Sequence, residues 1–221
     1  RALSREGSAP AIYYDREWFT WGKMRSLADQ IGEAIVRGGV PADKAIAFIP
    51  RNRPSAVAAM LKFIELQRDI AMIYAFQSAE AMARDIERLR PGIVVLADED
   101  VSDPVRMALD EVGAAGLVIG EGEVRLIVGY DRASRRSADF NKAQPHIAIL
   151  TSGTTGPPKQ FAVSYEMLAN HMVGATAALA KPDLEDHGAA PPLLFFPLGN
   201  ISGLYSTLPA MLLGWRAELV D

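Results

Sequence analysis

The chain contains 221 residues, of which 49% are hydrophobic and 23% are charged, a balance typical of a globular protein with a sizeable core. Lys and Arg number 23 against 27 Asp and Glu, so the formal net charge of −4 disfavours nucleic acid as a partner. There is no cysteine, which excludes disulfides, thiolate nucleophiles and cysteine-ligated zinc. No apolar run reaches the roughly 18–20 residues that span a bilayer. These features predict a soluble, cytoplasmic protein.

Short apolar segments alternate with amphipathic ones through the first part of the chain. Residues 11–20 predict a hairpin that turns at Asp15 and Arg16. Further strands are expected at 45–49, 70–74, 93–96, 117–119 and 124–128, and helices after Thr20, near Pro54, after Ser78 and over 104–112. Apolar strands separated by amphipathic helices are typical of parallel sheets covered on both faces. The predicted fold class is therefore α/β, multilayered, with mostly parallel sheets covered by helices.

The alternation stops at residues 129–144, which are rich in Arg, Ser and Ala and have few apolar anchors. This stretch predicts a surface linker between a first α/β segment, 1–128, and a second one, 145–221. A nucleic-acid patch is the alternative interpretation, and the net acidity of the chain disfavours it. In the second segment, strands are expected at 146–150, 161–164, 193–197 and 215–220, and helices at 165–180 and 202–213.

The loop at 151–159, Thr-Ser-Gly-Thr-Thr-Gly-Pro-Pro-Lys, directly follows an apolar strand, which is where ligands collect in open α/β sheets. Glycines allow backbone N–H groups to turn toward an anion, hydroxyls donate to phosphate oxygens without adding negative charge, and a lysine supplies a point charge. The candidate phosphate-binding residues are Thr151, Ser152, Gly153, Thr154, Thr155, Gly156 and Lys159. The alternative is a hydroxyl-rich turn that binds nothing.

This loop is not a Walker A loop, because Pro158 stands where that pattern needs its second glycine and Gln160 where it needs the hydroxyl that reaches magnesium. The three histidines, His146, His171 and His187, have no metal-ligand spacing. No metal site is therefore predicted from side chains of this chain.

The loop resembles the phosphate-binding signature of adenylate-forming enzymes, which include acyl- and aryl-CoA synthetases, adenylation domains of peptide synthetases and luciferases. The flanking sequence is also similar: Ser164-Tyr165-Glu166-Met167-Leu168 stands where the family has Ser-His-x-x-Leu, with Tyr165 in place of histidine. Residues 195–204 resemble the family's Pro-Leu-aromatic-His region, and Thr20, Trp21, Met24 and Ala28 resemble its N-terminal helix.

The resemblance implies the fold of the family's large N-terminal domain and an ATP-dependent acid–thiol ligase. Such an enzyme joins a carboxylic acid to the α-phosphorus of ATP with Mg²⁺ and passes the acyl group to a thiol such as that of CoA. The 151–159 loop would then orient the β- and γ-phosphates, with no base or nucleophile among its residues. Asn200, Ile201, Ser202 and Gly203 would lie at the acyl pocket, with Asn200 in place of the family's histidine or aromatic residue. The alternative is that Asn200 and Gly203 are turn and close-packing residues.

Motifs that the family uses for adenine, ribose and magnesium, and its catalytic lysine, do not occur in these 221 residues. The sequence is therefore expected to be an N-terminal fragment, inactive by itself and with no catalytic residue of its own. The alternatives are a non-catalytic module that binds nucleotide or another anion, and a module that forms a homodimer.

Overall fold

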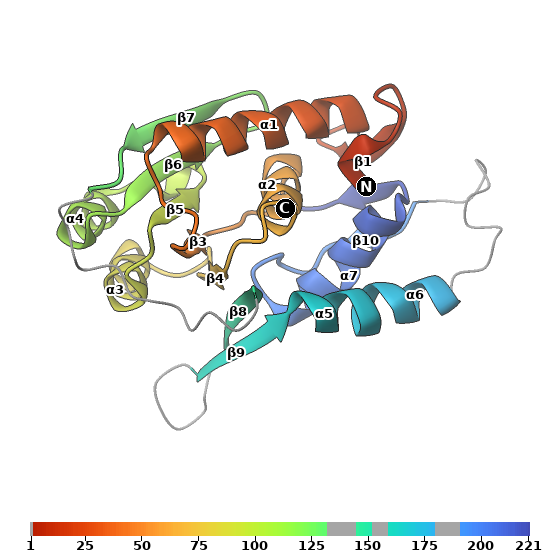
Figure 1. The fold of residues 1–221 in the computed structure, drawn as a ribbon. Coiled ribbons are helices and arrows are strands. Elements are labelled where there is room, and N and C mark those ends of the chain that lie inside the picture. Colours follow the sequence, from red (N-terminus) through yellow and green to blue (C-terminus); the bar gives the residue numbers. More distant parts are fainter. Residues whose placement is uncertain (1, 132–144, 152–158, 180–190) are drawn as a thin grey trace.

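The strands form two sheets, and helices lie on both faces of the larger one (Figure 1). The structure is a computed structural model that describes residues 2–131, 145–151, 159–179 and 191–221. The strands are β1 (Pro10–Tyr14), β2 (Glu17–Thr20), β3 (Ile46–Phe48), β4 (Ile70–Met72), β5 (Ile93–Leu96), β6 (Ala115–Ile119), β7 (Val124–Val128), β8 (His146–Thr151), β9 (Lys159–Ser164), β10 (Leu193–Leu194) and β11 (Ala217–Leu219). The main helices are α1 (Trp21–Arg37), α2 (Pro54–Glu65), α3 (Ala79–Leu89), α4 (Asp103–Val112), α5 (Tyr165–Met167), α6 (Gly174–Leu179) and α7 (Ile201–Leu213).

The larger sheet has the order β7-β6-β5-β3-β4-β8-β9 and the smaller one the order β10-β11-β1-β2. In the larger sheet β6, β5, β3, β4 and β8 run parallel, and the antiparallel strands β7 and β9 lie at its two edges. In the smaller sheet only the β1–β2 pair is antiparallel. The predicted α/β class with mostly parallel sheets is confirmed.

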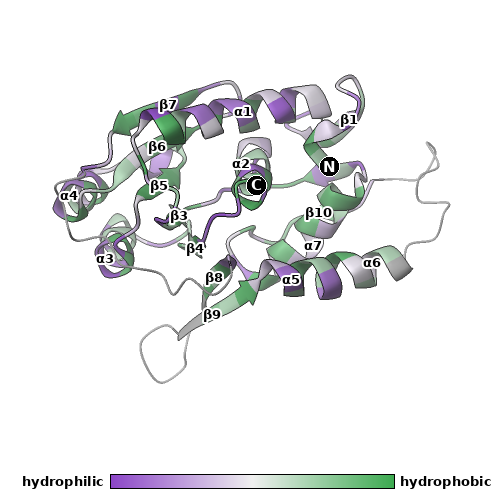
Figure 2. Ribbon diagram, viewed as in Figure 1, coloured by the Kyte–Doolittle hydropathy of each residue, from purple (hydrophilic) through white to green (hydrophobic). Residues whose placement is uncertain are grey.

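The larger sheet is buried on both faces because alternate residues of each strand enter different clusters. Ile46, Phe48, Ile70 and Met72 pack in the cluster that includes α1 and α2, whereas Ala47 and Ala71 pack against α3 and α4. The ribbon of α1 changes between hydrophobic and hydrophilic colours along its length (Figure 2), as a helix with one apolar face should. This two-sided burial is why the strands are continuous apolar runs in the sequence.

Local signals place several elements where the sequence predicts them. Asp15 and Arg16 have positive φ angles of 47° and 67° in the β1–β2 turn, as a tight two-residue hairpin requires. The side chains of Thr20 and Ser78 cap α1 and α3 by accepting backbone N–H groups three residues ahead. Pro54 occupies the first position of α2, where its missing N–H costs no helical hydrogen bond.

The predicted single helix over 165–180 is interrupted by a π-helical segment, Leu168–Val173, between α5 and α6. The backbone N–H of Gly174 donates to the carbonyl of Ala169, five residues earlier. A Cβ atom at position 174 would lie 3.3 Å from that carbonyl oxygen, so glycine suits this wide turn. The predicted strand 193–197 is also shorter, and β10 ends at Leu194, before Pro197, which has no N–H to donate to a ladder.

Both sheets take strands from both sides of residues 129–144. β8 and β9 extend the sheet of β3–β7, whereas β10 and β11 pair with the N-terminal hairpin. The division at 129–144 stays a prediction about the sequence, since residues 132–144 lie outside the described ranges. None of the helices within those ranges is long and apolar enough to cross a bilayer.

Candidate functional site

The β8–β9 hairpin brings the two ends of the predicted phosphate loop together. Thr151 is the last residue of β8, Lys159 is the first of β9, and the two are direct partners in the antiparallel register. β8 runs parallel to β4, so its last residue lies at the carboxyl edge of the larger sheet. This is the edge at which open α/β sheets bind ligands.

Five of the seven predicted phosphate-binding residues lie outside the described residues: Ser152, Gly153, Thr154, Thr155 and Gly156. Thr151 and Lys159 are paired in the β8–β9 register, so these two residues are the ends of the connection between the strands. The assignment of this segment to phosphate binding stays a prediction. The two ends of the segment lie at the carboxyl edge of the larger sheet.

Two arginines follow β3 at the same edge, two strands or about 10 Å from β8. Both guanidinium groups form ion pairs with carboxylates. Arg51 pairs with Asp100, and Arg53 pairs with Glu99 through two hydrogen bonds, from Nη1 to Oε2 at 2.8 Å and from Nη2 to Oε1 at 2.7 Å. The hydrogen bonds from Arg53 lower the pKa of Glu99. These arginines are neutralised within the fold, so Lys159 is the charge that we expect to meet a phosphate.

Asn52 lies between these arginines and joins three segments. Its side-chain N–H groups donate to the carbonyls of Phe196 and Val220 at 3.2 and 3.0 Å, and its Oδ1 accepts the N–H of Leu198 at 2.9 Å. The residue is only 4% exposed. It therefore fixes the segment before α7, and the residues after β11, to the start of α2. The sequence carried no local signal for this role, because its partners lie more than 140 positions away.

The candidate acyl-pocket residues lie at the start of α7. Asn200 is the N-cap, and its Oδ1 accepts the N–H of Gly203 at 2.8 Å. Gly203 is buried against the backbone of Pro197, whereas Ile201 and Ser202 are exposed. Two of the four residues thus have structural roles that helix capping and close packing explain. The structure does not test whether any of the four contacts an acid.

The aromatic side chains just before α7 are exposed. The rings of Phe195 and Phe196 lie 4.4 Å apart at their centroids, and both are more than a third exposed. Tyr74 and Phe76, which follow β4, are exposed as well, and the Arg51 guanidinium lies 5.0 Å from the Phe76 ring centroid. Leu204, by contrast, is fully buried in the core. Exposed aromatic rings therefore accompany the carboxyl edge of the larger sheet.

Tyr165, which replaces the family's usual histidine, has a structural contact. Its hydroxyl donates to the carbonyl of Arg68, just before β4. Burial raises the pKa of this hydroxyl, which keeps it a neutral donor. Tyr165 thereby ties the end of β9 to the amino end of β4, on the opposite edge from the loop.

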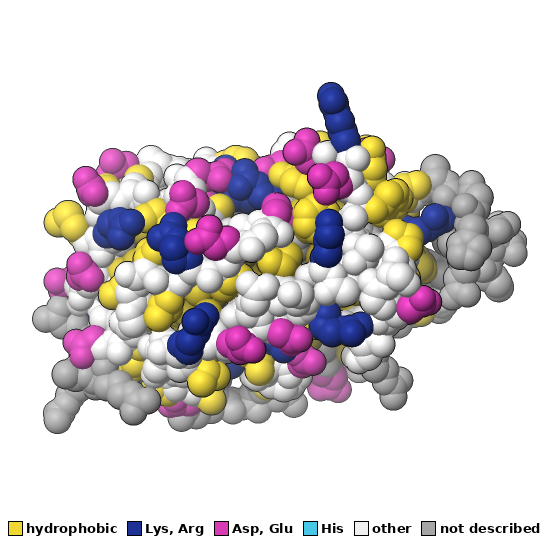
Figure 3. All heavy atoms as spheres, turned by 90° about the horizontal axis from the view of Figure 1, so that it is seen from above, with side chains coloured by type: hydrophobic (Ala, Val, Ile, Leu, Met, Phe, Trp, Pro, Cys, Tyr) yellow, Lys and Arg dark blue, Asp and Glu magenta, His cyan; other side chains and the backbone are white. Residues whose placement is uncertain are grey.

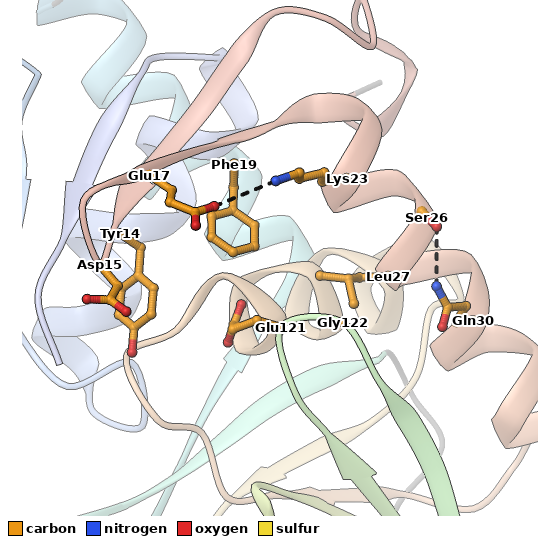
Figure 4. A pocket seen from close by; sticks show the side chains of 10 residues that line it. All are labelled: Tyr14, Asp15, Glu17, Phe19, Lys23, Ser26, Leu27, Gln30, Glu121 and Gly122. Atoms are coloured by element: carbon orange, nitrogen blue, oxygen red, sulfur yellow. Dashed lines mark hydrogen bonds and ion pairs between the residues drawn. The ribbon is translucent and has the colours of Figure 1, made fainter.

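A cavity of about 510 Å³ lies between the β1–β2 hairpin, α1 and the β6–β7 turn (Figure 4). Its lining residues are Tyr14, Asp15, Glu17, Phe19, Lys23, Ser26, Leu27, Gln30, Glu121 and Gly122. Glu121 accepts the N–H and the hydroxyl of Ser55 at 3.1 and 2.8 Å. None of the described residues of the predicted site lines this cavity. No local pattern in the sequence indicates it, because its lining comes from segments that are distant in the chain.

Burial raises the pKa of Glu121, although Ser55 and Arg53 act in the opposite direction. A raised pKa means that the charged carboxylate is a cost to the folded state, and this cost grows as the pH rises. We expect Glu121→Gln to keep contact with Ser55, with the amide oxygen accepting the backbone N–H and the amide N–H donating to the hydroxyl. The variant should gain stability relative to the native chain as the pH rises from 4 to 7. Urea unfolding at several pH values measures this difference.

Glu99→Gln is the matched control, because the pKa of Glu99 is lowered by Arg53 and its charged form stabilises the fold. This variant should lose stability relative to the native chain as the pH rises. Parallel pH profiles for the two variants would contradict the assigned environments.

Within the described residues, no group of three or more His, Asp or Glu side chains is arranged to hold a metal ion. His146 pairs instead with Asp69, at 2.9 Å between Nδ1 and Oδ1. His187 lies outside the described ranges.

Comparison with known protein families identifies the chain over its whole length. The protein family described as "AMP-binding enzyme" matches residues 1–221. The chain belongs to the AMP-binding enzyme family. This result confirms the resemblance that the 151–159 segment carries, and the relatives include acyl-CoA ligases.

Two curated relatives illustrate the range of the family. A medium/long-chain-fatty-acid–CoA ligase of Mycobacterium tuberculosis is 25% identical over 165 residues, which are 71% of this chain and 26% of the relative. A dimodular nonribosomal peptide synthase of Bacillus subtilis is 21% identical over 199 residues, which are 90% of this chain and 8% of the relative. The chain therefore spans a minor part of the relatives that it matches.

Solved structures share the fold. Apo MatB from Rhodopseudomonas palustris superposes with a TM-score of 0.75 at 16% identity, covering 99% of this chain and 44% of that one. The o-succinylbenzoate CoA synthetase of Bacillus subtilis, in complex with ATP and magnesium, gives a TM-score of 0.67 at 16% identity, covering 95% of this chain and 41% of that one. At this identity the likeness shows the architecture alone.

Proposed function

We propose that this chain provides the phosphate-binding loop of an ATP-dependent acid–thiol ligase. The enzyme would activate a carboxylic acid as an acyl adenylate and pass the acyl group to a thiol such as that of CoA. The observation that carries the proposal is the placement of the hydroxyl- and glycine-rich 151–159 segment between β8 and β9, at the carboxyl edge of a parallel sheet. Family membership over residues 1–221 supports it.

Charge repulsion is the main difficulty of this reaction, because a carboxylate must approach the negatively charged triphosphate. The loop would reduce this repulsion by donating hydrogen bonds from Thr151, Ser152, Thr154 and Thr155 and by bringing the positive charge of Lys159 to the β- and γ-phosphates. Gly153 and Gly156 would allow backbone N–H groups to face the same oxygens. Mg²⁺ would be bound largely through phosphate oxygens and would neutralise the leaving pyrophosphate.

The acid would bind near the start of α7, where Asn200, Ile201, Ser202 and Gly203 lie. Asn200 and Gly203 would position the helix start, and the exposed side chains of Ile201 and Ser202 would be available to the substrate. The exposed rings of Phe195 and Phe196 favour an aliphatic or aryl acid over a strongly polar one. The relatives include both a CoA ligase and a peptide synthase. We therefore propose only that the acceptor of the acyl group is a thiol, without naming the molecule that carries it.

The complete reaction is proposed for a protein of the family's full length. Residues 1–221 cover 44% and 41% of the two solved structures compared above, and we propose that they do not complete the adenylation by themselves. Binding of the triphosphate is the part of the function that this chain can be tested for.

The thermal midpoint of unfolding in the presence of Mg-ATP tests the loop assignment. A ligand that binds only the folded state, at about 100 times its dissociation constant, adds about 2.7 kcal/mol to the free energy of unfolding. We expect Mg-ATP to raise the midpoint of the native chain and Lys159→Ala to lose most of this shift.

The control is Lys23→Ala, which removes an exposed lysine from the cavity wall of α1 (Figure 4). This variant should keep the full shift. An equal shift in Lys159→Ala and in the native chain would contradict phosphate binding by the loop. A shift that vanishes in both variants would assign the effect to overall charge.

A further inference from the structure

The cavity of about 510 Å³ between the β1–β2 hairpin, α1 and the β6–β7 turn combines acidic and aromatic side chains in its lining. Its volume lies within the range of about 300–1,000 Å³ that is typical of small-molecule sites. The described residues of the phosphate loop and of the candidate acyl pocket are all outside this lining. A ligand bound here would therefore occupy a site of its own.

The charges that line the cavity have a negative excess. Asp15, Glu17 and Glu121 are acidic, and Lys23 is the one basic residue among the described lining residues. The Nζ of Lys23 lies 3.9 Å from Oε2 of Glu17, so these two charges offset each other. The carboxylates of Asp15 and Glu121 are left over, which favours a positively charged ligand.

The charged groups around this lining do not reverse its sign. Arg53 acts on Glu121 through space, yet its guanidinium is bonded to Glu99 and Asp221. Arg16, in the hairpin turn, adds one positive charge, which is less than the excess in the lining. The wider face that carries α1, seen from above in Figure 3, shows acidic and basic side chains mixed. The negative excess therefore belongs to the cavity and not to the face as a whole.

Glu121 has acceptor capacity left for a cation. An ionised carboxylate offers about four acceptor positions. Among the described residues, the N–H and the hydroxyl of Ser55 donate to Glu121, one to each oxygen. Burial raises the pKa of Glu121, so its charged form is poorly solvated. A cation at the remaining acceptor positions would stabilise that charge.

The aromatic wall suits an ammonium group that carries an apolar body. The rings of Tyr14 and Phe19 line the same space as Glu121, beside the aliphatic side chain of Leu27 (Figure 4). An ammonium group of the chain itself already uses this wall, because Nζ of Lys23 lies 5.1 Å from the centroid of the Phe19 ring. Aromatic faces attract cations at such distances.

We propose that this cavity binds a primary amine that carries an apolar or aromatic group. The ammonium group donates to Glu121, and the apolar part lies against Tyr14, Phe19 and Leu27. The site is independent of the proposed enzymatic function, since neither the phosphate loop nor the acyl pocket contributes a described residue to it.

Isothermal calorimetry of the chain with phenethylamine, near neutral pH, tests the proposal, with phenethyl alcohol as an uncharged probe of the same size. We expect saturable binding of the amine and at least about tenfold weaker binding of the alcohol. Glu121→Gln should weaken binding of the amine by at least about tenfold, because it removes the negative charge and replaces one acceptor by a donor.

Glu123→Gln is the matched control, because it removes the same charge from the same β6–β7 turn, and Glu123 does not line the cavity. This variant should bind the amine as the native chain does. Equal binding of the alcohol, unchanged binding in Glu121→Gln, an equal loss in both variants, or no binding by the native chain would each overturn the proposal. Urea unfolding of both variants at the same pH confirms that each is folded.

Discussion

Replacing Gly203 by alanine should lower the free energy of unfolding by at least about 3 kcal/mol. A Cβ atom at this position would lie 2.0 Å from the carbonyl oxygen of Pro197 and 2.8 Å from the Cα of Leu198. Both neighbours are backbone atoms, so no side-chain rotation relieves the clash. The first turn of α7 would have to move away from the segment that precedes it.

Urea unfolding of Gly203→Ala beside Gly122→Ala measures this effect. A Cβ atom at Gly122 would meet nothing within 4 Å, so that variant should differ from the native chain by no more than about 0.5 kcal/mol. If the two variants were equally stable, the close approach of α7 to residues 197 and 198 would be wrong. The same result would remove the structural basis for the acid subsite.

Replacing Asn52 by alanine should cost about 3 kcal/mol of unfolding free energy. The change leaves the N–H of Leu198 and the carbonyls of Phe196 and Val220 without their partner. Leaving a buried donor or acceptor unpaired costs about 1–3 kcal/mol, and water can reach part of the space that the side chain vacates. The segment before α7 and the residues after β11 should loosen together.

Gln30→Ala is the control for Asn52→Ala, because the only hydrogen bond of the Gln30 amide among the described residues is with Ser26 on its own helix. This variant should stay within about 0.5 kcal/mol of the native chain. Hydrogen exchange adds a local test: the Leu198 amide should lose protection in Asn52→Ala and keep it in Gln30→Ala. Retained protection in both would contradict the role of Asn52.

The order of strands and helices could be predicted from the sequence because its signals are local. Thr20 and Ser78 are residue types that favour the N-cap of a helix, and Pro54 is favoured in the first helical turn. Asp15 and Arg16 separate two segments that favour β-strands. The capping role of Asn200 could also be predicted from the sequence, since asparagine before an apolar helix is a frequent N-cap. The resemblance predicts a ligand contact at Asn200 and Gly203, and the alternative, that they are turn and close-packing residues, agrees with the structure.

The assembly of the sheets could not be predicted, because it depends on contacts between distant residues. Ile12 pairs with Ala217, and Ser55 meets Glu121 across the carboxyl edge. Neither pair has a local pattern in a single sequence. The hydrogen bonds that Asn52 makes to three distant residues, and the cavity around Glu121, could therefore not be predicted. The 151–159 segment could be proposed as a phosphate-binding loop because its hydroxyls, glycines and lysine stand together in one short stretch of sequence.

NMR of the backbone amides during addition of Mg-ATP tests phosphate binding by residues 151–159 most directly. We expect the largest shifts at the amides of Gly153 and Gly156 and their neighbours in 151–159, and loss of these shifts in Lys159→Ala. The amides around Arg37 and Leu66, at the opposite edge, should stay unchanged. Shifts concentrated away from residues 151–159, with the loop amides unchanged, would contradict its assignment as the phosphate-binding segment.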